Sequence, residues 1–138
     1  MKPTQERVRA VIIKDGDLIL IRMKHETIGE YWILPGGGVE KGETRIAALR
    51  RECMEEMGVE VSVSDEIGHY ELDEPDMVQS CYLYTAHVVK GTPGVGVGPE
   101  YSKGPDFVFE VQLIPLSEVK VKTILPKESK DILMAKIL

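Results

Sequence analysis

Cysteine, tryptophan and long apolar runs are scarce in this sequence. Its 138 residues include 2 cysteines and 1 tryptophan. Two cysteines cannot build the disulfide framework of a small secreted domain, so we expect a reducing, cytoplasmic setting. No apolar run approaches the ~20 residues that cross a bilayer. The polar N-terminal residues also lack the apolar core of a signal peptide, so no membrane partner is predicted.

Basic residues are outnumbered by acidic ones. The chain has 17 lysines and arginines against 23 aspartates and glutamates, a formal net charge of -6. This balance excludes a protein that holds long nucleic acid by neutralising its phosphates, because such binding needs clustered basic residues. A small polyanion remains compatible if metal ions supply positive charge. The hydrophobic fraction of 43% suffices for one core, and we expect a single domain over residues 1–138.

Hydrophobic periodicity predicts a mixture of strands and helices. Asp15-Gly16 separates two apolar runs and predicts a tight hairpin, because such turns need positive φ. The predicted strands are Val8–Ile13, Leu18–Ile21, Tyr31–Leu34, Val59–Val63, Val78–Val89 and Phe107–Ile114. Because strands and helices do not alternate strictly, we expect an α+β fold, layered as α/β/α with a mixed sheet between helices.

Two helices are predicted, at residues 45–57 and 127–138. Thr44 is a suitable N-cap for the first, and Gly58 stands where a glycine commonly ends a helix. The apolar stripe of this first helix is predicted to comprise Ile46, Leu49, Cys53 and Met57. Between the last two strands, residues 90–106 are rich in glycine and proline and predict a long loop, which is either functional or merely mobile.

The chemistry is concentrated in the first helix and the glycines before it. Glu52, Glu55 and Glu56 are spaced i, i+3 and i+4, so their carboxylates lie close together and repel one another. A divalent cation such as Mg²⁺ or Mn²⁺ turns this repulsion into coordination by hard oxygen ligands. In the glycine run Gly36–Gly38, a carbonyl could join the metal and the amides could face an anion. Alone, such a helix is usually a solvated face and such glycines a turn, but together they predict a metal-bridged phosphate site.

This combination resembles the signature of the Nudix hydrolases. The family pattern places Gly, Glu, Arg-Glu, Glu-Glu and Gly at fixed spacing from one another. The matching residues are Gly37, Glu43, Arg51, Glu52, Glu55, Glu56, Gly58 and Val59. Cys53 stands where an aliphatic residue is usual, and it packs as a small hydrophobe. The resemblance extends over Leu34–Val59 and implies the family's α/β/α fold.

The resemblance also implies an activity and residue roles. Family members hydrolyse a nucleoside diphosphate linked to another moiety, with Mg²⁺ or Mn²⁺. By this likeness the metal ligands are Glu52, Glu55 and Glu56, with Glu55 and Glu56 as the expected direct ones, and the carbonyl of Gly37 or Gly38 could supply another ligand. Arg51 is expected to pair with Glu43 and to hold the loop against the helix.

Roles outside these positions stay open. The general base is either Glu56 or a glutamate further along, Glu100 or Glu110, although each of the latter pair can equally be an ordinary surface carboxylate. The substrate is expected to contact Gly36 and Gly38, with Arg22 as a further candidate for its phosphates and with Glu100 and Glu110 as further candidate contacts. The lone Trp32 either stacks on a base or packs in the core.

Several functions fit the same residues. The expected substrate is a nucleoside triphosphate or an oxidised nucleotide, while sugar nucleotides, dinucleoside polyphosphates and ADP-ribose remain open. The alternative of another class is a non-catalytic nucleotide or ADP-ribose sensor with the same fold. An isoprenoid diphosphate isomerase would need a polar proton donor, for which Cys53 on an apolar stripe is poorly suited. A homodimer is plausible for the family.

Overall fold

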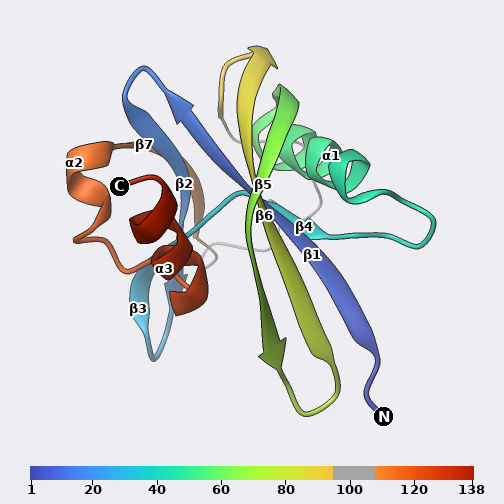
Figure 1. Cartoon of the computed structure of the whole chain (residues 1–138). Coiled ribbons are helices and arrows are strands. Elements are labelled where there is room, and N and C mark those ends of the chain that lie inside the picture. Colours follow the sequence, from blue (N-terminus) through green and yellow to red (C-terminus); the bar gives the residue numbers. More distant parts are fainter. Residues whose placement is uncertain (95–107) are drawn as a thin grey trace.

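The computed structural model of the chain describes residues 1–94 and 108–138. Within these residues, Figure 1 shows a strongly twisted sheet flanked by helices. The strands are β1 Thr4–Lys14, β2 Asp17–His25, β3 Gly29–Ile33, β4 Gly36–Gly38, β5 Glu60–Asp73, β6 Val78–Lys90 and β7 Phe109–Pro115. The helices are α1 Arg45–Met57, α2 Leu116–Val119 and α3 Lys127–Lys136.

Strand β1 is the centre of the sheet. It pairs in parallel with β6 from Thr4–Val78 to Ile12–Ala86, and antiparallel with β2 and β4. The described strands follow the order β3-β2-β1-β6-β5, while β4 joins β1 and β7 joins β2. One parallel pairing among antiparallel ones makes the sheet mixed, as predicted.

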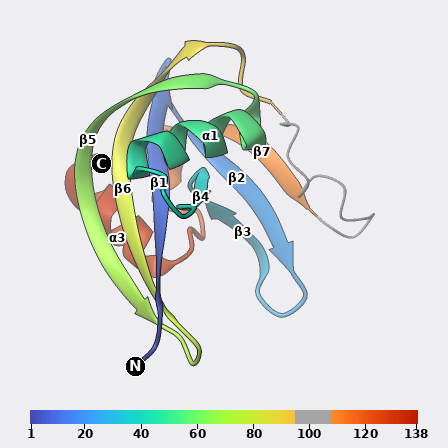
Figure 2. The same ribbon diagram turned by 90° about the vertical axis from the view of Figure 1, so that its right-hand side faces the viewer.

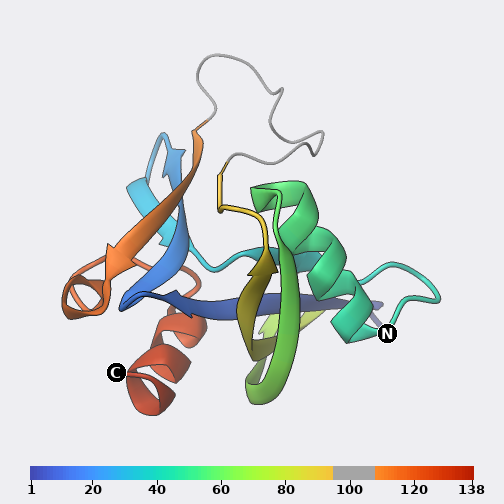
Figure 3. The same ribbon diagram turned by 90° about the horizontal axis from the view of Figure 1, so that it is seen from above.

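Helices α1 and α3 cover opposite faces of this sheet. Figure 2 places α1 in front of β1 and α3 behind it, and Figure 3 shows the same separation from above. One apolar cluster joins Val8 of β1 to Leu49 of α1. The other joins Val11 of β1 to Leu133 of α3. Because successive strand residues point to opposite faces, β1 contributes to both cores. The expected α+β fold with helices on both sides of a mixed sheet is confirmed.

Local sequence signals correctly predicted the turn between β1 and β2 and both ends of α1. Asp15 and Gly16 have φ values of 52° and 83°, and Lys14 pairs with Asp17 across the predicted two-residue turn. Helix α1 begins and ends where predicted. The Thr44 side chain accepts a 3.1 Å hydrogen bond from the Ala47 amide, which satisfies one of the free N–H groups of the first turn.

The glycine run, which was predicted only to end the strand Tyr31–Leu34, is itself a short strand. Gly36–Gly38 pair with Arg7, Val8 and Arg9 of β1. A β-carbon on Gly36 would stand 1.9 Å from the Val8 carbonyl oxygen, so only glycine permits this approach. Strand β5 also exceeds its prediction and runs on to Asp73. The first residue of the predicted strand Phe107–Ile114 lies outside the described residues, and β7 begins at Phe109.

The apolar stripe of α1 is rotated relative to its prediction. Ile46 is 48% exposed, while Ala48 and Glu56 are buried with Leu49 and Met57. Strand β4 lies along this flank of the helix and gives the Glu56 carboxylate a hydrogen-bond donor. The buried face therefore turns toward β4 and away from Ile46.

Candidate active site

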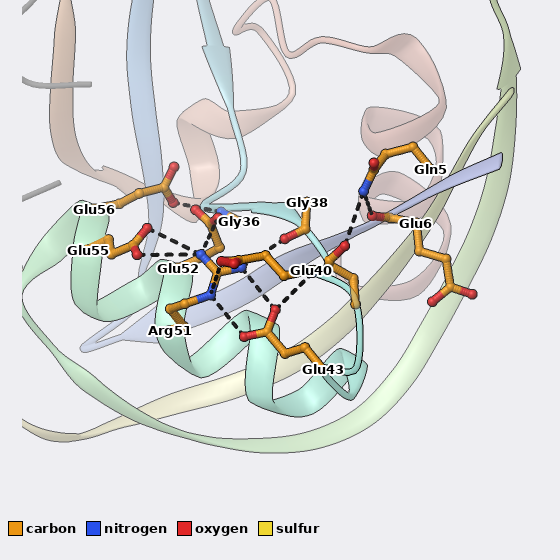
Figure 4. Close-up of polar contacts among 11 residues, drawn as sticks. Gln5, Glu6, Gly36, Gly38, Glu40, Glu43, Arg51, Glu52, Glu55 and Glu56 are labelled. Atoms are coloured by element: carbon orange, nitrogen blue, oxygen red, sulfur yellow. Dashed lines mark hydrogen bonds and ion pairs between the residues drawn. The ribbon is translucent and has the colours of Figure 1, made fainter. Parts of the chain in front are cut away.

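The site forms where β4 lies against α1. Figure 4 shows the glutamates of α1 directed at the glycine strand, with Arg51 between them. The structure thus brings together most of the predicted site residues, which are Gly36, Gly37, Gly38, Glu43, Arg51, Glu52, Glu55 and Glu56. They come from three consecutive pieces of chain: the strand β4, the loop after it and the last two turns of α1.

Arg51 holds the loop to the helix. Its Nε and Nη2 donate to the two oxygens of Glu43 at 2.9 and 3.0 Å, and Nη2 also donates to the Gly38 carbonyl at 2.9 Å. This bidentate geometry suits the planar guanidinium. Hydrogen bonding by Arg51 holds the pKa of Glu43 below its ordinary value, and a backbone bond from Glu40 acts in the same direction.

The same guanidinium reaches two of the predicted metal ligands. Arg51 Nη1 lies 3.0 Å from Glu52 Oε1 and 3.3 Å from Glu55 Oε2. Hydrogen bonding to Glu43 raises the pKa of Arg51, and Glu52 raises it further. The guanidinium of Arg51 therefore offsets the mutual repulsion of the carboxylates of Glu43, Glu52 and Glu55. The sequence indicated the pair with Glu43 but not these further contacts.

Glu56 joins the helix to the glycine strand. It is 5% exposed, and its Oε1 accepts a 2.7 Å hydrogen bond from the Gly36 amide. A buried carboxylate without such a donor would be costly. The bond therefore stabilises both the inward position of Glu56 and the docking of β4 on α1.

Gly37 leaves room for the Glu52 carboxylate. A β-carbon on residue 37 would stand 2.5 Å from Glu52 Cδ and 2.6 Å from Oε1. The carboxylate thus occupies the space that any other side chain would fill. Glycine at this position brings the strand backbone and a carboxylate into direct contact.

The donor set fits a hard divalent cation in kind. Glu52, Glu55 and Glu56 offer only oxygen atoms, which Mg²⁺ and Mn²⁺ prefer, and the Glu52 carboxylate stands next to Gly37 of β4. Within residues 1–94 and 108–138, no three acidic, thiol or imidazole side chains converge as a ready-made metal centre. Glu52 and Glu55 are instead both in contact with the guanidinium of Arg51.

A hollow of about 280 Å³ opens beside these carboxylates. One wall is acidic and consists of Glu52, Glu55 and Glu56 with the glycines of β4. Another part of the lining is apolar and consists of Met23, Ile33 and Phe109. Among the residues that the structure describes, Arg7 and Arg9 of β1 also line the hollow. A hollow lined by a few polar groups and by apolar side chains is typical of small-molecule sites.

Sequence reasoning missed the five residues that complete this hollow. Met23, Ile33 and Phe109 come from three strands, so no local pattern joins them. Arg7 and Arg9 did leave a signal, since two arginines at i and i+2 flank Val8 at the start of the apolar run of β1. Arg9 donates to the Leu34 carbonyl at 3.0 Å.

Two predicted substrate contacts lie elsewhere. Arg22 donates to Glu30 at 2.8 Å and to Glu110 at 3.3 Å, and neither Arg22 nor Glu110 lines the hollow. Arg22 pairs with Glu110 and Met23 with Phe109 in the β2–β7 register, so alternation turns the ion pair away from the face that carries Met23 and Phe109. Glu100, the other candidate base, lies outside the described residues.

Two other predicted positions are buried in the core. Cys53 has no exposed surface, and burial followed by the charge of Glu56 raises the pKa of its thiol to about 12. This burial counts against the isomerase interpretation, which needs an accessible proton donor. Trp32 is 7% exposed and its Nε1 donates to Gln112 at 2.9 Å, so it packs in the core.

Comparison with known sequences identifies the family to which the chain belongs. The NUDIX domain model matches residues 3–135. The ADP-ribose pyrophosphatase of Methanocaldococcus jannaschii is 38% identical over 69 residues, or 50% of this chain and 41% of that protein. The oxidized purine nucleoside triphosphate hydrolase of Mus musculus is 30% identical over 87 residues, or 60% of this chain and 55% of that protein. The chain thus spans about half the length of these curated relatives.

Solved structures share the fold. A MutT NUDIX hydrolase from Burkholderia pseudomallei superimposes with a TM-score of 0.74 and 23% identity, covering 99% of this chain and 100% of that one. A MutT protein from Methanosarcina mazei gives a TM-score of 0.72 and 22% identity, covering 97% of this chain and 93% of that one.

Among the described residues, no helix has both the length and the apolar character needed to cross a bilayer.

Proposed function

The chain belongs to the NUDIX domain family, and from this premise we propose that it is a pyrophosphohydrolase. It cleaves the pyrophosphate bond of a nucleoside diphosphate linked to another moiety, by attack of water at phosphorus. One observation supports this most: three carboxylates of α1 and the glycine strand β4 form one wall of a hollow that is also lined by apolar side chains. That wall can recruit positive charge next to a bound nucleotide.

The residues of the acidic wall divide into two roles. Glu52, Glu55 and Glu56, with the Gly37 carbonyl, would hold Mg²⁺ or Mn²⁺, the kind of ion that NUDIX hydrolases generally use. When bound, such an ion neutralises phosphate oxygens and lowers the pKa of a coordinated water. Arg51 and Glu43 position this wall through their bidentate pair.

Glu56 is the general base that we favour. A base must lie within reach of the water whose proton it takes, and Glu56 lines the hollow. Glu110 is instead engaged with Arg22 outside it. The amide of Gly36 fixes the Glu56 carboxylate, so its orientation is set before a substrate enters.

The proposed substrate is a nucleoside triphosphate or an oxidised nucleotide. The apolar side chains of Met23, Ile33 and Phe109 suit the face of a nucleobase. The murine relative is named for hydrolysis of oxidised purine nucleoside triphosphates, whereas the archaeal relative is named for ADP-ribose. ADP-ribose is therefore the second substrate class to test.

The setting forms part of the same proposal. We expect residues 1–138 to act as one domain in the cytoplasm. The expected partner is a small nucleotide, and we expect no binding to long nucleic acid or to a membrane. A homodimer is part of the same proposal. Both cysteines are buried free thiols, which suits a reducing compartment.

A substrate panel tests the activity. Nucleoside triphosphates, their oxidised forms, ADP-ribose and sugar nucleotides are incubated with Mg²⁺ or Mn²⁺, and products are identified by mass spectrometry. We expect release of a nucleoside monophosphate, and Glu56→Gln should lower the rate by orders of magnitude. The matched control is Glu118→Gln, at an exposed position of α2. Tight nucleotide binding without turnover of any substrate would overturn the proposal in favour of a non-catalytic sensor.

A further inference from the structure

Two hollows of the molecule meet at Arg7. The first is the hollow of about 280 Å³ described above. The second, of about 870 Å³, lies between the loop after β4 and the hairpin that joins β5 to β6. Arg7, Gly38 and Glu52 line both. A ligand held at Arg7 could therefore extend into either hollow while it stays beside the carboxylates of α1.

The side chain of Arg7 lacks the partners that most arginines have here. Arg45 pairs with Glu6, Arg51 with Glu43 and Arg22 with Glu30. Arg7 is half-buried, and in the part of the chain that the structure describes its guanidinium makes no hydrogen bond and no ion pair. Five N–H donors held partly out of water without an acceptor are unfavourable.

The electrostatic surroundings of Arg7 match that geometry. Burial lowers its pKa, and the neighbouring Arg9 lowers it further, while Glu52 and Glu56 act in the opposite direction. Two arginines thus stand next to each other opposite an acidic wall. An anion placed between the arginines and a cation-loaded wall would gain attraction from both sides.

We propose that Arg7 is the substrate-binding residue that grips a phosphate group at the junction of the two hollows. Its planar fork matches two oxygens of one phosphate. The base of the nucleotide then faces Met23, Ile33 and Phe109, and the phosphate beyond the cleaved bond faces the larger hollow. This inference rests on the proposed function, because the nucleotide bound by Arg7 is the substrate proposed there.

Binding of inorganic pyrophosphate tests the inference without catalysis. Isothermal titration calorimetry in Mg²⁺ compares the wild type with Arg7→Gln, Arg7→Lys and the control Arg50→Gln, an exposed arginine of α1 outside both hollows. We expect the Kd to rise at least tenfold for Arg7→Gln and less for Arg7→Lys, which keeps the charge but loses the fork. Arg50→Gln should bind as the wild type does.

Melting temperature separates binding from a structural role. Since Arg7 has no hydrogen bond to lose, Arg7→Gln should melt without ligand at or above the wild-type temperature, and only the rise caused by pyrophosphate should shrink. Should this variant fail to fold, Arg7→Met keeps the apolar stem and is expected to show the same tenfold loss. A folded, charge-free variant that binds pyrophosphate with the wild-type Kd would overturn the inference.

Kinetics distinguish this inference from the proposed function. With a hydrolysed nucleotide, Arg7→Gln should raise KM at least tenfold and leave kcat within about threefold, as expected for a contact made equally in the ground and transition states. Hydrolysis with an unchanged KM would overturn the role of Arg7 and leave the activity standing. Loss of pyrophosphate binding in a protein that hydrolyses nothing would support Arg7 and overturn the activity.

Discussion

The carboxylate of Glu52 lies directly over the backbone of Gly37, with its Cδ 2.5 Å from the place of a β-carbon on that residue. Replacing Gly37 by alanine therefore displaces Glu52. Because the displaced group is the end of a flexible side chain, we expect a loss of at most about 1 kcal/mol in the free energy of unfolding. Hydrolysis should nevertheless fall at least tenfold.

Gly36→Ala, unlike Gly37→Ala, should act mainly by lowering the stability of the fold. Its β-carbon would meet backbone, the Val8 carbonyl oxygen at 1.9 Å, so pairing of β4 with β1 must break and the protein should unfold at much lower urea. Urea titration and initial rates on both alanine variants check the contrast. A Gly37→Ala protein with full activity would mean that the position of Glu52 is not needed.

Glu56 offers a pair of variants that separates charge from packing. Glutamine keeps an oxygen that can accept the Gly36 N–H, so Glu56→Gln should fold with nearly the wild-type stability. Alanine leaves that amide without its acceptor, and the free energy of unfolding should fall by about 1–3 kcal/mol. Urea denaturation followed by circular dichroism measures both. Equal stabilities for the two variants would contradict a role for the Gly36–Glu56 bond.

Arg51→Lys tests the bidentate pair with Glu43. Lysine keeps the charge but cannot bond both Glu43 oxygens and the Gly38 carbonyl at once, so we expect a loss of about 1–3 kcal/mol in the free energy of unfolding. The neighbouring exposed Arg50→Lys is the matched control and should change it by less than about 0.5 kcal/mol. A double-mutant cycle with Glu43→Gln isolates the pair, and no coupling between the two changes would refute it.

The ion pair of Glu6 with Arg45 should make the free energy of unfolding depend slightly on pH in the acid range. A hydrogen bond from Arg45 lowers the pKa of Glu6 below its ordinary value of 4.5. A depressed pKa in the folded state means that the stabilisation is complete above 4.5 and is lost as pH falls through the folded-state pKa. Since both side chains are more than a third exposed, the effect should stay below about 1 kcal/mol.

The measurement is the difference in unfolding free energy between wild type and Glu6→Gln from pH 7 to pH 3. We expect wild type to be the more stable at pH 7 and the difference to shrink as the pH falls below 4.5. A difference that grows on acidification would have the wrong sign and would exclude this pair as its source.

The parts of the fold that sequence predicted are those determined locally. Helix α1 was predictable from end to end because Thr44 and Gly58 terminate it through their own side chain and backbone. Strand β4 was not, because three glycines favour a turn and become a strand only where Val8 and Arg9 of β1 offer their backbone. Its existence depends on a partner distant in sequence.

Strand β5 shows a second limit. Its period of two is visible up to Val63, but register shifts follow between Val63 and Glu66 and between Glu66 and Gly68. Each shift moves later residues to the other face, so the alternation that predicts a strand is lost while the strand continues. A single-sequence pattern cannot see through such irregularities.

The candidate site divides in the same way. Its acidic wall lies within one short stretch of chain, and the spacing of Glu52 to Glu56 together with the glycine run before the helix was sufficient to predict it. The apolar part of the lining takes Met23 from β2, Ile33 from β3 and Phe109 from β7. Only the sheet order brings these together, so no spacing rule could have found them.

Arg51 gives the acidic wall a tethered counter-ion. Its guanidinium already contacts Glu52 at 3.0 Å and Glu55 at 3.3 Å, so under our proposal a divalent cation would compete with it for the same carboxylate oxygens. The affinity for the metal would then be the difference between two attractions to these oxygens. Such competition would favour a doubly charged ion over Na⁺ or K⁺, because the Coulomb attraction of a cation to a carboxylate grows with its charge.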